Sequence, residues 1–409
     1  MNVRIDIDEA RVGRERARRR AAAAGCVLLL AQLAAPVHAG PSEQAKRIYE
    51  RIAGVPPPPA VLAQMVTAIN NSPGQPGLLA AAAIATQAPT FYNVTLKNLV
   101  IPWTNRDQTV FAPFNDYAAT VIGMVRDDVP FNTALSADLL YVVNAPGLPA
   151  PSNASNAHYA TAEANGVDLS TALKPSTQSA TYGTPTAATA GLLTTYAAEA
   201  AFFIKGTNRA MFRFTMINHF CNDMHTLMDT TRPTDRVRQD VARSPGGDSR
   251  VYLQTCVGCH SGMDPMAQAF AYYNFNGTVG PGPMNTGTME YTQGQVQPKY
   301  LINATNFPFG FVTPDDSWSN RWRGGINASL GWDPTLPGSG NGAKSLGMEL
   351  ESSDAFAQCQ VVKVFTAVCY RAPLASDAAT LTSIKGSFKS NGYKLKQVFQ
   401  QAAAACPGQ

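Results

Sequence analysis

The most chemically distinctive stretch of the chain is Cys256-Val257-Gly258-Cys259-His260. Two thiols separated by two residues can form thioether bonds to the two vinyl groups of one porphyrin, and the histidine that follows can coordinate the iron. The pattern therefore predicts one covalently bound haem c, with His260 as the proximal iron ligand. We expect a backbone carbonyl or a similar acceptor to hold the second ring nitrogen of this histidine.

Two other kinds of site use the same cysteine spacing, namely a redox-active dithiol and half of a zinc site. A dithiol of the thioredoxin type would need a βαβ context, and a zinc site would need a second Cys/His pair at finger spacing. The sequence contains neither pattern, so haem attachment is the favoured interpretation. The motif occurs once, which argues against a dihaem or multihaem chain.

The sixth iron ligand is less closely defined. A methionine would raise the reduction potential, a histidine would lower it, and an open position would admit small ligands. Met348 precedes a C-terminal helix, as the distal methionine of simple cytochromes c does, so it is the first candidate. Met289, in a Gly/Pro-rich loop, is the second. The alternative for both is ordinary packing. His219 and His225 are six residues apart, do not share a helix face, and are expected to be surface or capping histidines.

The first 39 residues have the features of a targeting segment. Basic residues precede the apolar run AAAAGCVLLLAQLAAPV, and Val37-His38-Ala39 forms a small-x-small cleavage site. We expect a signal peptide cleaved after Ala39, with an uncleaved amphipathic N-terminus as the alternative. The segment holds seven of the 32 basic and four of the 28 acidic residues, so the mature chain carries a net charge of only +1.

These features predict a periplasmic or secreted protein. No later stretch reaches 18 apolar residues, so we expect no membrane span after signal cleavage. The small net charge argues against a nucleic-acid partner.

Four mature cysteines remain outside the motif, and they allow three pairings. If the last three helices run up, down and up, Cys369 and Cys406 come to the same end of the bundle. This favours a Cys369–Cys406 disulfide and leaves Cys221 to pair with Cys359. Unpaired buried thiols are the alternative, although an oxidising compartment favours disulfides.

The fold class expected from hydrophobic periodicity is mainly α. We expect a signal peptide at 1–39, an N-terminal helical domain at 40–187, and a cytochrome c-like haem domain at 188–409. A long loop is expected at 145–187, and a small hairpin from 299–305 and 309–313 within a β/loop insertion. The expected helices, including a C-terminal three-helix segment, are 42–54, 60–70, 89–103, 115–128, 131–143, 189–206, 208–227, 256–275, 349–371, 376–390 and 393–406.

The run CVGCHSGMDPMAQAFAYYNFNG resembles the haem segment of the planctomycete-type cytochrome c family, in which C-x-x-C-H is followed by Asp-Pro and an aromatic-rich helix. Asp264-Pro265 stands at that place here. NRAMFRFTMINHFC, ending at Cys221, is similar to the family's helix before the haem. LGMELESSDAFAQCQVVKVFTAVCYRAPLASD is similar to its C-terminal domain, with Phe356–Cys359 and Arg371 at matching places. The family usually has a Gly shortly after Asp-Pro and an acidic residue near Ala271, and this chain lacks both.

The resemblance implies a monohaem c-type cytochrome and names no substrate. We therefore expect one-electron transfer to a redox partner protein, and a non-enzymatic role. The alternative is a haem enzyme or a small-ligand-binding or sensor protein with an open distal site. A third possibility is an assembly module that docks a partner through the N-terminal helices and the loop at 145–187. Arg321 and Arg323 could pair with haem propionates, or simply stack on the neighbouring tryptophans.

Overall fold

The computed structural model describes residues 39–278, 280, 286–301 and 305–406. Apart from Ala39, the expected signal peptide lies outside these residues. Helices dominate, and the strands form three separate two-stranded antiparallel sheets, which confirms the mainly α class. In the described part of the chain, no helix combines the length and the apolar character that crossing a bilayer requires.

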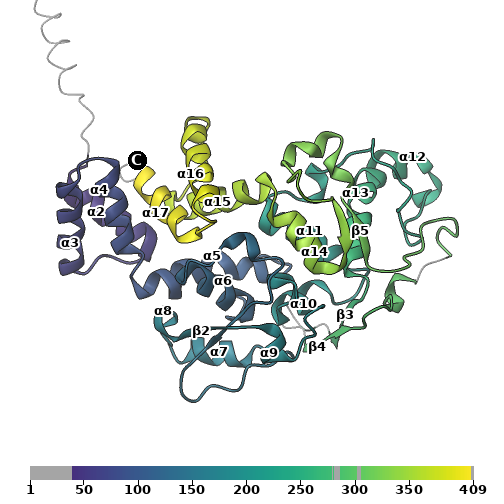
Figure 1. Cartoon of the computed structure of the whole chain (residues 1–409), viewed down its shortest axis with the longest axis horizontal. Helices are drawn as coiled ribbons and strands as arrows, with labels where there is room; N and C mark the ends of the chain where they lie inside the picture. The colour runs from purple at the N-terminus through teal and green to yellow at the C-terminus, as the bar shows by residue number, and fades with distance from the viewer. Residues whose placement is uncertain (1–38, 279, 281–285, 302–304, 407–409) are drawn as a thin grey trace, which may run out of the picture.

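The N-terminal helices form a small bundle at one end of the molecule (Figure 1). It consists of α2 (Pro41–Ala53), α3 (Pro59–Asn71) and α4 (Gln75–Ala85). Each of them begins with a proline in its first two positions, where no intrahelical N–H donor is needed. Gly54 ends α2 in the left-handed conformation, with φ of 73°. The N-cap of α2 is Gly40.

The segment expected as a helix at 131–143 is mostly not helical, and that expectation was wrong. Only η3 (Phe131–Thr133) is helical, and β1 (Leu140–Val143) pairs with β2 (Leu173–Ser176). The run Leu-Tyr-Val-Val is rich in aromatic and β-branched residues, which fit a pleated surface better than a helix. The ring of Tyr141 packs on Gly123 of the helix α6 (Asp116–Arg126), where a Cβ would overlap the ring.

The stretch 145–187 was expected to be a long loop, and this expectation was also wrong, because the stretch contains regular secondary structure. Besides β2 it contains α7 (Ala157–Ala164), α8 (Leu169–Ala172) and α9 (Gln178–Tyr182). The caps of α8 and α9 are the side chains of Asp168 and Thr177, each of which accepts a backbone N–H. The remaining elements of this half are the π-helical η1 (Phe91–Leu96), α5 (Lys97–Val100), η2 (Ile101–Thr104) and α6 (Asp116–Arg126).

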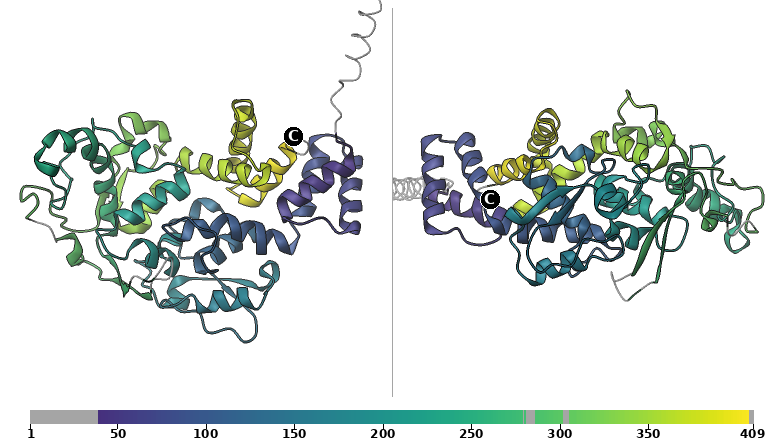
Figure 2. Two further views of the ribbon diagram at one scale, coloured as in Figure 1. Left: turned by 180° about the vertical axis from the view of Figure 1, so that it is seen from behind. Right: turned by 60° about the horizontal axis from the view of Figure 1, so that its bottom comes forward.

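The second half contains the Cys-x-x-Cys-His segment, at the far end of the molecule from α2–α4 in both orientations (Figures 1 and 2). The helix expected at 256–275 ends at Phe270, and β3 (Tyr273–Thr278) follows. This strand pairs with β4 (Thr286–Tyr291). The observed hairpin therefore lies earlier in the sequence than the hairpin that was expected at 299–313. Residues 302–304 of that expected hairpin lie outside the described residues, and Pro298–Tyr300 forms a 3₁₀ turn, η9.

The other elements of this half are η4 (Gly191–Thr194), α10 (Tyr196–Phe202), α11 (Arg209–Phe220), η5 (Met224–Thr226), η6 (Pro245–Gly247), α12 (Ser249–Val251), η7 (Tyr252–Cys256), α13 (Val257–Ala267), η8 (Gln268–Phe270), β5 (Ser317–Ser319), η10 (Arg321–Arg323), η11 (Ile326–Leu330), β6 (Ser339–Asn341), α14 (Gly342–Glu351), α15 (Asp354–Cys369), η12 (Ala375–Asp377), α16 (Ala378–Ser390) and α17 (Leu395–Ala405).

Two disulfides, both as predicted, tie these elements together. Cys221 at the end of α11 pairs with Cys359 in α15, and Cys369 at the end of α15 pairs with Cys406 after α17. The helix expected at 349–371 is in fact divided between α14 and α15. A single cluster of buried apolar side chains extends from α2 to α17. The domain boundary at residue 187 stays a prediction.

Candidate functional site

The Cys-x-x-Cys-His residues lie on one continuous helical segment built from α12, η7, α13 and η8. Asp248 caps its start by accepting the N–H of Arg250 at 2.9 Å. Cys256, Cys259 and His260 are at positions i, i+3 and i+4, so they share one helix face. Cys256 is the last residue of the π-helical turn η7, and such turns occur frequently at functional sites.

Several of the buried residues of this helix are small, among them Gly258, Ser261 and Gly262. Gly262 lies directly against the indole ring of Trp322, and a Cβ at Gly258 would come within 3.2 Å of Met228. Ser261 donates a hydrogen bond to the carbonyl of Asp229 at 3.1 Å. Because this side of the helix is closely packed, the helix cannot rotate about its axis. The motif cysteines and His260 therefore stay on the opposite side, where they are partly exposed.

The two motif cysteines are free, whereas the four other cysteines of the described chain are all in disulfides. The Sγ atom of Cys259 lies 3.4 Å from the carbonyl oxygen of Met224. Burial raises the pKa of the Cys259 thiol, and the neighbouring Cys256 and Asp223 raise it further.

His260 makes one well-defined side-chain contact, through its Nδ1 atom. This nitrogen lies 3.1 and 3.2 Å from the two carboxylate oxygens of Asp264, one helical turn later. An ionised carboxylate only accepts hydrogen bonds, so Nδ1 is the nitrogen that donates to Asp264, and in the neutral ring Nε2 is the nitrogen with the free lone pair. The expected acceptor for the second ring nitrogen is therefore present, as a carboxylate in place of a backbone carbonyl.

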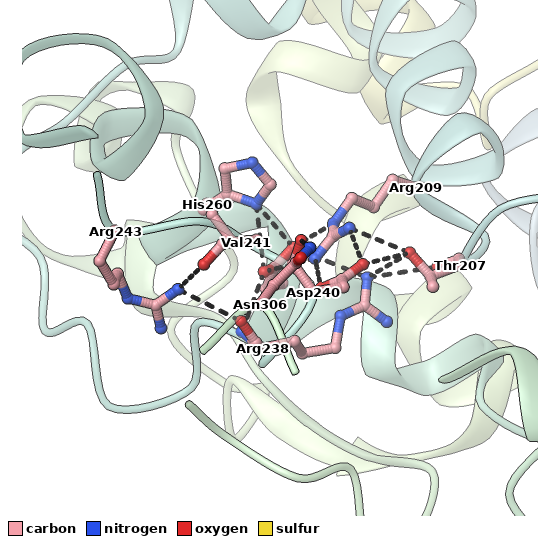
Figure 3. A network of polar contacts seen from close by, with 9 residues as sticks. Thr207, Arg209, Arg238, Asp240, Val241, Arg243, His260 and Asn306 are labelled. Carbon is pink, nitrogen blue, oxygen red and sulfur yellow. Dashed lines mark hydrogen bonds and ion pairs between the residues drawn. The ribbon is translucent and has the colours of Figure 1, made fainter. Parts of the chain in front are cut away.

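Asp264 is itself held by two arginines from distant parts of the chain, Arg209 and Arg238, which Figure 3 labels beside His260. Arg209, the first residue of α11, donates to both of its oxygens at 2.7 and 3.0 Å and to both oxygens of Asp240 at 2.5 and 2.8 Å. The Nη2 atom of Arg238 lies 3.7 Å from Oδ1 of Asp264. Burial alone would raise the pKa of Asp264, but the charges of Arg209 and Arg238 and the hydrogen bond from His260 hold it well below the usual value.

A cavity of about 430 Å³ lies beside the start of the motif helix. Two of its lining residues, Val237 and Tyr252, also belong to the small apolar cluster that contacts Cys256. Leu253 and Phe309 in the lining are 58% and 91% exposed, which is unusual for large apolar side chains grouped at one place. The complete lining is Thr234, Asp235, Val237, Arg243, Ser249, Tyr252, Leu253, Phe307, Phe309, Gly310 and Phe311.

The structure places the two candidate distal ligands on other elements. Met348 lies on α14 and is 48% exposed. Met289 lies on β4 opposite Phe275 and packs at the edge of the main core. The residues labelled around His260 come instead from the start of α11 and the residue Thr207 before it, from the segment 238–243, and from Asn306 (Figure 3). A distal methionine stays a prediction.

Within the described residues, no three His, Cys, Asp or Glu side chains form a cluster that could hold a metal ion. A haem iron requires only one or two protein ligands, because the porphyrin supplies the other four.

The other candidate residues have different roles from those expected. Arg323 forms a bidentate ion pair with the buried Glu349, at 2.8 and 2.7 Å, and Arg321 pairs with Asp235 at 2.8 Å. His225 is exposed, as expected, but His219 is buried and shares a hydrogen bond with Tyr117, whose hydroxyl oxygen lies 2.8 Å from Nε2 of the imidazole. Burial, together with the charge of Lys363, lowers the pKa of His219 to about 3, so this imidazole is neutral.

No pattern in the sequence indicates the roles of Arg209, Arg238 and Asp240. Arg209 is 55 residues from Asp264 along the chain, and no local spacing links them. A signal was available only for Asp264, because it stands at i+4 from His260 and helix geometry brings such pairs together.

Comparison with known proteins identifies no relative of this chain. No family model matches the sequence, and searches of the curated proteins and of the solved structures also find no match.

Proposed function

We propose that this chain is an exported monohaem c-type cytochrome that transfers one electron at a time. The observation that supports this most strongly is the state of the cysteines. Four are joined in disulfides, while Cys256 and Cys259 remain free on the same partly exposed helix face as His260. Free thiols in a chain that otherwise forms disulfides are explained if they are reserved for thioether bonds.

The residues present fit the chemistry of haem c. Cys256 and Cys259 would hold the porphyrin, and His260 would offer Nε2 to the iron, because Asp264 occupies Nδ1. The aromatic cavity beside Tyr252 is suited to covering a flat conjugated ring. When bound, the haem supplies a centre that alternates between ferric and ferrous states. The protein would fix the proximal ligand and keep water from the part of the ring that this cavity covers.

The two disulfides support an oxidising compartment, periplasmic or extracellular, because such bonds persist there. The partner would be a redox protein. Leu253 and Phe309 are exposed beside the attachment site and would contribute apolar contact area. The mature charge of +1 would give little long-range steering.

The test is export of the full chain in a bacterium with c-type haem maturation. We expect one haem per chain that remains bound after denaturation, and a sharp α-band on reduction. Cys256→Ala and Cys259→Ala should each remove one thioether bond, and His260→Ala should abolish the low-spin spectrum. His225→Ala is the matched control, because that imidazole is exposed, and it should leave haem content unchanged. Wild-type protein without covalent haem would contradict the proposal.

A haem enzyme or small-ligand-binding protein is the second candidate, and one observation favours it. A carboxylate hydrogen bond raises the basicity of a proximal histidine, a feature of use to ligand-activating sites as well as to low-potential carriers. Rapid binding of carbon monoxide by the reduced protein would support this candidate. A methionine–iron charge-transfer band that is lost in Met348→Ala or Met289→Ala would support the electron carrier and identify its distal ligand.

A further inference from the structure

Asp264 is the centre of the polar network beside His260, and each of its oxygens has several partners. Its side chain is fully buried. It accepts from His260 Nδ1 and from Nε and Nη2 of Arg209, and the backbone N–H of Arg238 approaches Oδ2 at 3.4 Å. A carboxylate with so many donors cannot rotate freely, so the direction of its hydrogen bond with His260 is fixed.

The charges of this network are balanced without His260. Asp264 and Asp240 supply two negative charges, and Arg209 and Arg238 supply two positive charges within 4 Å. Arg209 bridges the two carboxylates. His260 therefore donates through Nδ1 to a carboxylate whose charge Arg209 and Arg238 already compensate.

We infer that Asp264, fixed by Arg209 and Arg238, is a positioning residue that selects the Nδ1–H tautomer of His260 and lowers the reduction potential of a haem held by that histidine. The first half of this inference concerns the protein alone, and the second half rests on the proposed function. A carboxylate acceptor increases electron donation by the ring, and hydrogen bonding to the axial ligand is one of the means by which a protein sets haem potential. The expected direction is stabilisation of the ferric state.

The tautomer is tested in the haem-free wild-type chain. Nitrogen-15 labelling of histidine and long-range proton–nitrogen correlation spectra distinguish a protonated Nδ1 from a protonated Nε2, and comparison with His260→Gln assigns the signals. We expect the Nδ1–H form with a strongly downfield proton. A predominant Nε2–H form of His260 would overturn the inference. This measurement needs neither haem nor an Asp264 variant.

The potential is tested in the haem-loaded protein with three variants. Asp264→Asn removes the charged acceptor of His260, Asp240→Asn removes an equal charge that does not contact His260, and Glu349→Gln disrupts a buried arginine–carboxylate pair on α14. We expect Asp264→Asn to favour the ferrous state at least tenfold, which for one electron is about 59 mV. Asp240→Asn should give less than half of that shift in millivolts, and Glu349→Gln should give none.

The outcomes of the two proposals can be told apart. Equal shifts in Asp264→Asn and Asp240→Asn would mean that charge alone acts, and the positioning role would be wrong. An unchanged potential in Asp264→Asn would also contradict the role of Asp264 in setting the potential. Absence of covalent haem in the wild type would contradict the proposed function, and the tautomer measurement would still decide the role of Asp264.

Discussion

The indole of Trp322 lies directly on the backbone of Gly262, in the helix that holds the Cys-x-x-Cys-His motif. Trp322 is fully buried, so it cannot move aside for a larger residue. We expect Gly262→Ala to destabilise the protein by about 2 kcal/mol or more, because overpacking a closely packed core forces backbone and side-chain shifts. Urea unfolding of the haem-free protein measures the loss.

Gly386 provides the matched control for this substitution. It is an exposed residue within α16, and a Cβ there would have no neighbour within 4 Å. Gly386→Ala should therefore stabilise the protein by about 0.5–1 kcal/mol, as alanine does in a helix interior. Equal effects of the two substitutions would show that contact with Trp322 is unimportant.

The disulfide Cys369–Cys406 links α15 to the end of α17 across 37 residues of sequence. We expect Cys369→Ala/Cys406→Ala to lower the unfolding free energy by about 3 kcal/mol, since a cross-link restricts the unfolded chain. Denaturant unfolding at equal haem content measures the change. In the haem-free chain, Cys256→Ser should cost much less, because that thiol is free and partly exposed. A double variant as stable as wild type would contradict the pairing.

The local parts of this architecture could be predicted from the sequence, and the nonlocal parts could not. The face shared by Cys256, Cys259 and His260 follows from helix periodicity, and the pairing of Cys369 with Cys406 followed from the order of three helices. By contrast, Leu140–Val143 is an apolar run without clear periodicity, and its partner strand 33 residues later decides its conformation. Arg209 and Asp240 meet Asp264 only through the tertiary fold.

Lys363 on α15 is a partly buried residue that places its ammonium group 4.3 Å from the centre of the Trp103 ring. Burial lowers the pKa of Lys363 to about 7, whereas in the unfolded chain it stays near 10.5. The unfolded state then binds more protons between pH 7 and 10.5, so this lysine destabilises the fold below pH 7, and the penalty disappears as the pH rises through that window.

Lys363→Met should therefore stabilise the protein below pH 7 by on the order of 2 kcal/mol, with the gain declining to nothing near pH 10.5. The contact with Trp103 offsets part of the penalty. Thermal or urea unfolding at a series of pH values gives the profile. Lys46→Met, at an exposed position in α2, is the control and should show no such dependence. A gain for Lys363→Met that is constant with pH would contradict the buried charge.

Glu351, at the end of α14, accepts hydrogen bonds from the backbone N–H of Leu135 at 2.6 Å and from the hydroxyl of Ser136. Its side chain is almost fully buried and has no positive partner among these contacts, so burial raises its pKa to about 8 despite the two hydrogen bonds. In the unfolded chain the value is near 4.5. The folded state binds more protons in this window, so its stabilising contribution is complete below pH 4.5 and is lost as the pH rises through 8.

Glu351→Gln keeps the shape of the protonated side chain and removes its ability to ionise. We expect the variant to match the wild type near pH 4 and to be more stable by on the order of 3 kcal/mol above pH 8. The measurement is the unfolding free energy of both proteins across this range. Glu43→Gln, at an exposed site in the first turn of α2, should leave the profile unchanged. If Glu351→Gln were instead less stable at pH 8, the ionised carboxylate would be the form that holds Leu135 and Ser136 in place.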